Sequence, residues 1–385
     1  MLLKSFHFTI SLCNRIAVIR FCYVSLCFLA GCATQRITGA LPPWRIMTNV
    51  AETAPHDKPA LWTDGTHTLL AWPGEPASPS IRLANVDSPG RSRSLTLGRI
   101  PRDVSLFTAA DGLLHLMWLD QTLPGQTQLV GALIDTEGNT QRIPGVISNR
   151  PAVHYAGIST PDHGVLTLWA GEHELYAQTV DARGRPRPAL RIARTGRRPV
   201  AAYDSIGNLH MAWLEPTAPE IWTIRYLYLP KGALPANDDP PALPIGVIHS
   251  ADVLESFVMG TDAQNVYLLW TTVQIGDVQA AKLAGLTFPL NDNTAVNSIA
   301  PLAGARWPDV ADQPQPVLTL GVTLDGQQPA ALNVTPTGFS TPRPVYASSA
   351  LIGATALAVT PGQLNLGWTE TRANGTATIY YATTR

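Results

Sequence analysis

A short apolar run that ends in tryptophan recurs along the chain. In the clearest copy, residues 113–118 are apolar apart from one histidine, Asp111-Gly112 precedes them and Asp120 follows them. An Asp-Gly pair in front of an apolar run predicts a tight hairpin turn. Six copies align on their tryptophans, which are Trp72, Trp118, Trp169, Trp213, Trp270 and Trp368.

The spacing of these tryptophans indicates a seven-fold repeat. Successive gaps are 46, 51, 44, 57 and 98 residues, and the last gap equals two periods of 49. We therefore expect a seventh copy, without tryptophan, at residues 317–322. Strand-forming repeats with a period of this size are typical of β-propellers. The sequence thus predicts an all-β fold, a seven-bladed β-propeller of four-stranded antiparallel blades.

The second unit shows how four strands fit into one period. The second and third strands are apolar on both faces, as expected where sheets pack against neighbours on each side. The tryptophans should fill the space between adjacent blades. Two stretches break the rhythm, at residues 230–249 and 291–306, and we predict that both are loops between blades. The four strands of the second unit are expected at residues 103–108, 113–119, 128–135 and 141–147.

The two ends of the repeat region complement each other. The last unit stops at the C-terminus after its third strand, expected at residues 376–383, while residues 45–50 form a lone strand pattern with no unit of its own. We expect this N-terminal strand to complete the last blade and close the ring, because closure leaves no bare sheet edge.

The first 31 residues have the composition of a leader. They carry Lys4, Arg15 and Arg20 and no acid, and the apolar run 21–31 is too short to span a bilayer. The run ends in Leu29-Ala30-Gly31-Cys32, which resembles the lipobox of bacterial lipoproteins. The resemblance implies a signal peptide at 1–31, a lipidated Cys32, a tether at 32–43 and a propeller domain at 44–385. Because no aspartate follows the cysteine, the resemblance also implies that the protein is anchored in the outer membrane. The alternative is an ordinary secretory signal.

Composition narrows the possible ligands. All four cysteines lie at or before position 32, so the chain beyond it has no disulfide and no thiolate metal site. Three of the 27 basic residues lie in the leader, which leaves 24 against 28 acidic residues. A net charge of −4 does not indicate a nucleic-acid partner. We expect no cofactor and no metal.

Charged residues recur at two places of the repeat, each in five of the seven units. A cation stands beside a proline where the first strand of a blade begins, and an acid follows the tryptophan at the end of the second strand. We expect an inner basic ring and an outer acidic ring on one face. The two rings could pair with each other, or the converging cations could bind a carboxylate or phosphate. The cations are Lys58, Arg102, Arg150, Arg198 and Arg306, and the acids are Glu75, Asp120, Glu172, Glu215 and Glu370.

One blade carries a resemblance to an enzyme superfamily. Arg99-Ile100-Pro101, followed by the Asp111-Gly112 turn, resembles the Arg-Ile-Pro motif of sialidases, and Ile379-Tyr380-Tyr381-Ala382 is similar to strands of that superfamily. The resemblance implies that Arg99 binds a substrate carboxylate and that Asp120 is a candidate acid. The Ser-x-Asp-x-Gly-x-Thr-Trp turn of that superfamily is absent.

The remaining signals do not complete a catalytic set. His115 and His210 occupy equivalent positions in two units, and we interpret them as packed side chains rather than metal ligands. We therefore predict a lipid-anchored cell-envelope propeller with a binding or scaffold role. Its expected partners are the membrane, through Cys32, and a protein or an acidic glycan at the rim. The alternative is a sialidase-like glycan hydrolase or a carbohydrate-binding protein.

Overall fold

The computed structural model describes residues 41, 43–53, 58–87, 92–123, 126–235, 238–249, 253–274 and 277–385. The expected leader, the lipidation residue Cys32 and most of the expected tether lie outside the described residues. Within the described part, no helix is long and apolar enough to cross a membrane.

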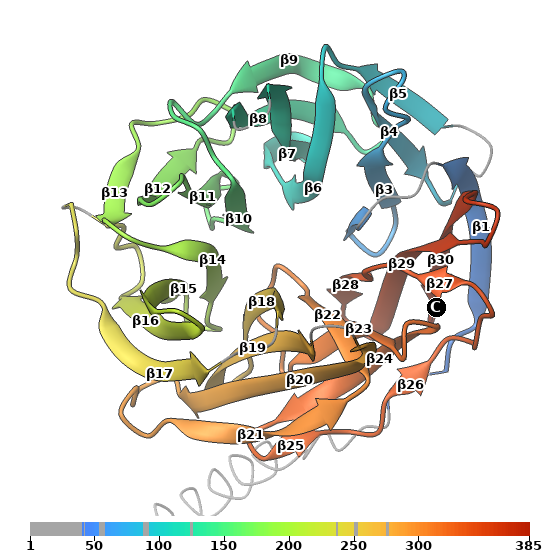
Figure 1. Ribbon diagram of the computed structural model, residues 1–385. Helices are drawn as coiled ribbons and strands as arrows, with labels where there is room; N and C mark the ends of the chain where they lie inside the picture. Colours follow the sequence, from blue (N-terminus) through green and yellow to red (C-terminus); the bar gives the residue numbers. More distant parts are fainter. Residues whose placement is uncertain are drawn as a thin grey trace, which may run out of the picture. The chain divides into compact units, whose positions relative to one another are not determined.

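Seven antiparallel sheets stand around one axis, as Figure 1 shows. This confirms the expected all-β, seven-bladed fold. Five sheets have four strands each. The sixth has five because its outer strand is broken into two short pieces, and the seventh includes a strand from the start of the chain. The one helical turn among the described residues is η1 (Ala110–Gly112).

Each of the first four blades follows the chain from the axis outwards. Blade one is β2 (Ala60–Thr63), β3 (Thr68–Pro73), β4 (Ser80–Asn85) and β5 (Ser92–Thr96). Blade two is β6 (Ile100–Thr108), β7 (Leu113–Leu123), β8 (Gln126–Asp135) and β9 (Thr140–Val146). Blade three is β10 (His154–Ser159), β11 (Val165–Ala170), β12 (Leu175–Val180) and β13 (Leu190–Ala193). Blade four is β14 (Arg197–Tyr203), β15 (Leu209–Ala218), β16 (Ile221–Leu229) and β17 (Leu243–His249).

Blade five keeps this pattern, while blades six and seven depart from it. Blade five is β18 (Val253–Thr261), β19 (Asn265–Gln274), β20 (Asp277–Pro289) and β21 (Asn297–Ala303). Blade six is β22 (Ala305–Val310), β23 (Thr319–Leu324), β24 (Gln328–Thr335), β25 (Gly338–Phe339) and β26 (Arg343–Pro344). Blade seven is β28 (Ala356–Thr360), β29 (Gln363–Thr371) and β30 (Ala377–Thr383), with the short strand β27 (Leu351–Ile352) beside β29 and β1 (Ile46–Thr53) beside β30.

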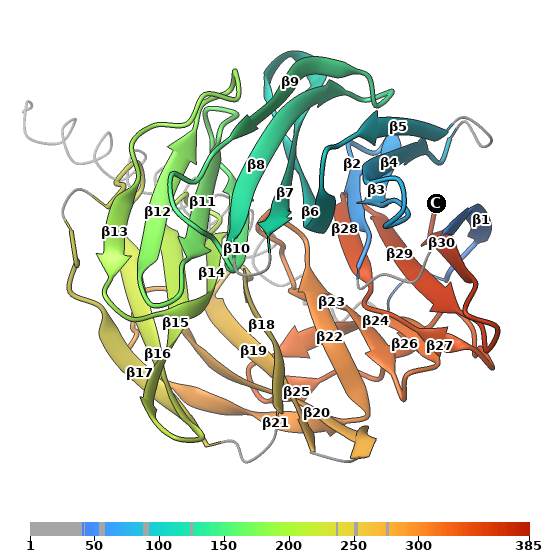
Figure 2. The ribbon, with the colours of Figure 1, turned by 45° about the horizontal axis from the view of Figure 1, so that its top comes forward.

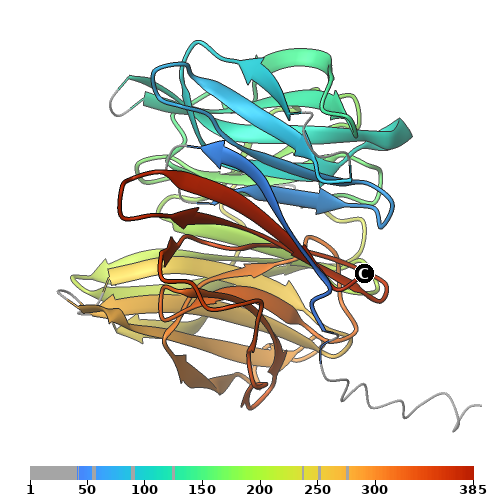
Figure 3. The same ribbon diagram turned by 90° about the vertical axis from the view of Figure 1, so that its right-hand side faces the viewer.

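Strand β1 comes from the start of the described chain and pairs antiparallel with β30 at its end. The pairing runs from Ile46 opposite Thr383 to Thr53 opposite Ala377. Figure 3 shows the blue strand β1 alongside the dark red strands of blade seven. Val50 and Ala51 of β1 pack against a buried cluster that contains Trp72 and Tyr381, so the strand joins blade seven to blade one.

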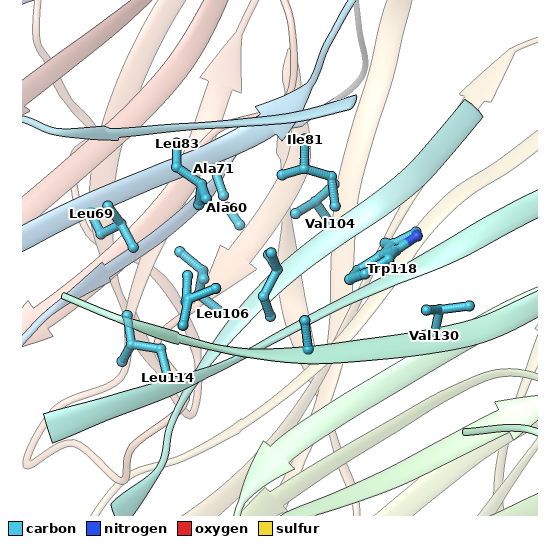
Figure 4. Packing of buried hydrophobic residues seen from close by; sticks show 13 residues of the cluster. Ala60, Leu69, Ala71, Ile81, Leu83, Val104, Leu106, Leu114, Trp118 and Val130 are labelled. Atoms are coloured by element: carbon cyan, nitrogen blue, oxygen red, sulfur yellow. The ribbon is translucent and has the colours of Figure 1, made fainter. Parts of the chain in front are cut away.

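The repeat tryptophans fill the seams between neighbouring blades, as the sequence predicted. Trp118 of blade two packs with Leu69 and Ile81 of blade one, and Figure 4 shows this seam from close by. Trp169 packs with Met117 of blade two in the same way. Burial of large aromatic side chains between sheets is a main source of stability in such a fold.

Two sequence predictions were wrong. Residues 230–249 and 291–306 were expected to be loops, yet they contain β17, β21 and the start of β22. Strands β17 and β21 are outer strands that lie largely exposed, with Ile248 and Ile299 as their buried side chains. Prolines are tolerated at such sheet edges, and each of these strands contains one, Pro244 and Pro301. A proline therefore does not exclude a strand at these positions.

Candidate binding site at the channel mouth

The first strand of every blade lies nearest the axis, as Figure 2 shows, and residues of these inner strands line a central channel. The channel encloses a cavity of about 300 Å³. Small residues of three inner strands are among those that line it, namely Ala156, Ala201 and Ala356. We call the end where the inner strands begin the channel mouth, and the end where they finish the far end. Along the six residues of β10 the two ends are roughly 16 Å apart.

Four inner strands have a β-bulge near the mouth: in β18 (blade five) the pairing register shifts between Leu254 and Ser256, and the other three bulges share a further feature. The pairing register shifts between Arg102 and Ser105 in β6, between Arg197 and Val200 in β14, and between Arg306 and Asp309 in β22. Each of these three bulges places a non-glycine residue in the left-handed region: Asp103 has φ 49°, Arg198 47° and Trp307 48°. That conformation is costly for such residues and concentrates at functional sites. A bulge also redirects side chains at a sheet end. These three bulges lie in blades two, four and six.

His154 begins the inner strand of blade three, between two of these bulges. Burial, together with the charges of Arg198, Arg197 and Arg102, lowers its pKa to about 4. The imidazole is therefore neutral at pH 7. Its ring nitrogens make no hydrogen bond within the described part of the chain. A neutral, unpartnered imidazole thus stands in a strongly positive environment.

The three arginines around His154 differ in how they are held. Arg198 donates from Nη1 to the carbonyl oxygen of Glu255 at 2.7 Å, and Glu255 and Asp103 oppose the effect of burial on the pKa of Arg198, which is lowered overall. Arg102 and Arg197 are exposed, and among the described residues their side chains have no hydrogen bond or ion pair. Two guanidinium groups at the mouth are therefore available to an anion.

Glu255 connects this cluster to blade six. Its carboxylate accepts two hydrogen bonds from Arg306, one of them from Nε at 3.0 Å. Both side chains are largely buried, at 13% and 17% exposure. The Arg306 guanidinium in turn lies over the Trp307 ring, 4.0 Å from its centroid. Glu255 thereby joins two inner strands, and the Arg306–Trp307 stack is fixed in place.

Lys58 forms another closed pair at the mouth. Its Nζ contacts Asp309, and the second carboxylate oxygen of Asp309 accepts the backbone N–H of Leu357 at 2.7 Å. This carboxylate holds blades one, six and seven together.

The remaining predicted cation, Arg150, lies outside the His154 cluster. It pairs with Glu174 at 2.9 Å rather than with Glu172, and Glu174 also binds Arg191. Glu172 is exposed, and its carboxylate has no hydrogen bond or ion pair within the described chain. These contacts extend into a network over the outer strands of blades three and four.

The predicted acidic ring does not face the predicted basic ring pair by pair. Glu215 pairs with Arg225 on the neighbouring strand and accepts a hydrogen bond from Thr195 at 2.8 Å. Asp120 has its pKa raised by burial, with the charge of Arg99 opposing the rise. One Asp120 oxygen is buried without a hydrogen-bond partner in the described chain. The end of a strand fixes where a charged side chain lies, but its ion-pair partner depends on how the neighbouring blades pack.

Several mouth residues escaped the sequence analysis: His154, Arg197, Glu255 and Trp307. The sequence pattern at these four positions was weak. Each lies at the start of an inner strand, where an alignment of all seven units on that position would have collected them. No group of three potential metal-binding side chains occurs among the described residues.

The far end is closed by a different kind of contact. Asp312, in the loop after β22, reaches across the channel to blade three. Its oxygens accept the backbone N–H of Ser159 at 3.1 and 3.3 Å and the Ser159 hydroxyl. The Asp312 side chain touches the cavity but protein surrounds it, and this desolvation raises its pKa against the effect of the Ser159 hydrogen bonds. Burial, with Asp162 and Asp312 nearby, raises the pKa of Tyr203 to about 12.

Comparison with known proteins identifies structural neighbours of this propeller. An ulvan lyase of polysaccharide lyase family PL25 matches with TM-score 0.60 and 11% identity, over 86% of this chain and 95% of that one. A PL25 ulvan lyase bound to -[GlcA(1-4)Rha3S]- matches with TM-score 0.59 and 11% identity, over the same shares. The polysaccharide lyase Uly1 matches with TM-score 0.55 and 10% identity, over 91% and 94%. No protein-family model and no curated protein matches the sequence. The chain is therefore a seven-bladed β-propeller whose structural neighbours include glycan-acting enzymes.

Proposed function

We propose that this protein binds an acidic glycan at the channel mouth. The observation that carries the proposal is the pair of exposed guanidinium groups, Arg102 and Arg197, beside a neutral His154. Guanidinium groups bind carboxylates and sulfates through paired hydrogen bonds. The neutral imidazole adds a donor or an acceptor for a sugar hydroxyl.

The surroundings of the cluster favour a ligand rather than a structural role for these arginines. Lys58 and Arg306 are closed into pairs with acids from other blades, whereas Arg102 and Arg197 have no such pair within the described chain. Two structural neighbours that share this fold are named as polysaccharide lyases, and one was solved with an acidic saccharide. These likenesses concern the fold, and they suggest which class of probe to try first.

The test compares two double variants of equal charge change. Arg102→Ala/Arg197→Ala removes the cluster, and Arg183→Ala/Arg187→Ala removes two exposed arginines from the hairpin between β12 and β13. Calorimetry would measure binding of oligogalacturonate and of ulvan oligosaccharides, with maltohexaose as the neutral control. We expect the mouth variant to lose at least roughly tenfold in affinity, since charge-assisted hydrogen bonds contribute about 1.5–3 kcal/mol each.

The control variant should bind within about twofold of the parent protein, because long-range attraction is largely screened at physiological salt. Equal losses in both variants would indicate unspecific attraction. Unchanged affinity in the mouth variant would refute the proposed site.

We further propose that the propeller is anchored in the bacterial outer membrane by a lipid on Cys32. The support is the leader composition and the Leu29-Ala30-Gly31-Cys32 segment, which resembles a lipobox. Replacing Cys32 by Ala should release the protein from washed membranes, because the acyl chains would be its main anchor. If the Cys32→Ala variant stayed on membranes washed in high salt, the proposed lipid anchor would be contradicted.

A further inference from the structure

Trp307 differs from the tryptophans of the repeat. The repeat tryptophans lie on the second strands of six blades and pack into the seams, whereas Trp307 lies near the start of the inner strand β22 at the channel mouth. It belongs to none of the hydrophobic clusters of the described chain. Its side chain remains partly exposed. Core packing therefore does not account for a tryptophan here.

The backbone at Trp307 is strained. Its φ of 48° lies in the left-handed region, which is a clear outlier for a bulky aromatic residue. The same conformation recurs at Asp103 and Arg198, in the bulges beside the cationic cluster. Strain of this kind persists where the surrounding structure enforces it, and it concentrates in binding and catalytic sites.

The ring is already fixed before any ligand arrives. Arg306 lies over one part of it at 4.0 Å, and Glu255 holds Arg306 by two hydrogen bonds. The indole N–H has no hydrogen-bond partner in the described part of the chain, yet it is not among the buried unsatisfied groups. A rigid aromatic ring with an accessible polar edge binds at low entropic cost.

We propose that Trp307 is a platform for a sugar ring of the acidic glycan. The apolar C–H face of a pyranose would pack on the exposed part of the indole, while an acidic group of a neighbouring sugar binds Arg102 and Arg197. The contacts Arg198–Glu255–Arg306–Trp307 connect the two subsites. The ligand class is therefore a charged oligosaccharide of at least two sugars, not a lone anion. This inference rests on the proposed function.

Variants at Trp307 would test the platform. Trp307→Phe keeps an aromatic face, while Trp307→Leu keeps apolar bulk without one. With oligogalacturonate of four sugars as the probe, we expect Trp307→Leu to weaken binding roughly tenfold, within the range measured for aromatic contacts. Trp307→Phe should recover most of the loss. Binding of galacturonate alone should change by less than about twofold in both variants.

Tryptophan fluorescence provides a second measurement, because ligand binding would not change the emission of Trp307 if its role were only structural. Saturation with the tetrasaccharide should change the tryptophan emission of the parent protein and of Trp222→Phe, a control at a partly buried tryptophan on β16. The change should be lost in Trp307→Phe. A retained change in Trp307→Phe would overturn the platform.

The outcomes separate this inference from the function on which it rests. If Trp307→Leu binds the tetrasaccharide like the parent while the Arg102/Arg197 variant does not, the platform is wrong and the anion site stands. If neither variant affects binding, the proposed function itself is wrong. If Trp307→Leu lowers the melting temperature, the folded variant Trp307→Phe decides through its fluorescence. Equal affinities of Trp307→Leu and Trp307→Phe would overturn the platform.

Discussion

The two ends of the channel are built from opposite kinds of contact. At the far end, a single carboxylate, Asp312, takes up the donors of Ser159 and ties blade six to blade three. At the mouth, several cations gather, and some of them have no acid partner in the described chain. A closed contact stabilises the ring, whereas open charges on a rigid frame suit a ligand.

The backbone shows the same contrast. In β6 and β14 the pairing is regular toward the far end, through Thr108 and Tyr203, and is shifted only at the mouth. The irregularity thus lies at one end of strands that are otherwise well paired. The far end is held by the contact between Asp312 and Ser159. The strained backbone conformations of the inner strands lie at the mouth.

The largest loss of stability should come from blade seven, where β1 pairs with β30. This loss is the reference against which the effects of changes at the two channel ends can be compared. We expect that β1 closes the ring by its pairing with β30. Deleting residues 44–53 would expose the edge of β30 and the cluster around Trp72. The free energy of unfolding, measured in denaturant, should fall by at least about 4 kcal/mol. Deleting residues 33–40 is the control, and an equal melting temperature for both deletions would contradict closure.

The next largest effect should come from the far end. Asp312→Ala leaves the N–H and hydroxyl of Ser159 without an acceptor, so we expect a loss of about 2–3 kcal/mol in unfolding free energy. Glycan binding at the mouth should stay the same. Asp312→Asn keeps one acceptor oxygen and should lose less. A variant with normal stability and impaired binding would reverse the comparison of the two ends.

The two ends should also respond to pH in opposite directions. The pKa of His154 is lowered to about 4 from 6.5, so the unfolded chain binds the extra proton first and stability falls as pH drops from about 6.5 to about 4. His154→Gln should therefore gain stability relative to the parent at pH 4. The pKa of Asp312 is raised, so its contribution is greatest at low pH and is lost as pH rises. Relative to the parent protein, Asp312→Asn should therefore be less stable at pH 4 than at pH 7. If the stability of both variants changed with pH in parallel with the parent protein, both assignments would be contradicted.

The smallest effect should come from the closed pair at the mouth. The side chain of Lys58 is 42% exposed, and Asp309 keeps its hydrogen bond from Leu357 without it. Lys58→Met should cost about 0–1 kcal/mol, as is usual for exposed ion pairs. Asp309→Ala should cost more because it also leaves the Leu357 N–H unpaired. A larger loss for Lys58→Met than for Asp312→Ala would show that the mouth, not the far end, holds the ring.

Much of the fold could be read from the sequence because a blade is a local unit. The tryptophan repeat reports the second strand of each blade, whose side chains are buried on both faces whatever the neighbouring blade contains. Blade number, strand order and the seam positions of Trp118 and Trp169 follow from that repeat. Outer strands such as β17 were missed because prolines in and before them indicated a loop, even though residues such as Leu243 and Val247 are apolar. Arg102, Arg198 and Arg306 lie in the first residues of inner strands, whereas Arg150 lies four residues before β10.

The contacts of the site were decided by the tertiary structure. Ser159 and Asp312 are 153 residues apart in sequence, and Arg306 meets Glu255 across 51 residues. Only the curvature of the ring determines which strand starts face each other, and no local pattern encodes it. The bulges at Asp103, Arg198 and Trp307 also depend on how each strand meets its neighbours. The sequence by itself therefore determined the repeat and its charged positions, while ring closure decided which charges are paired and which remain open.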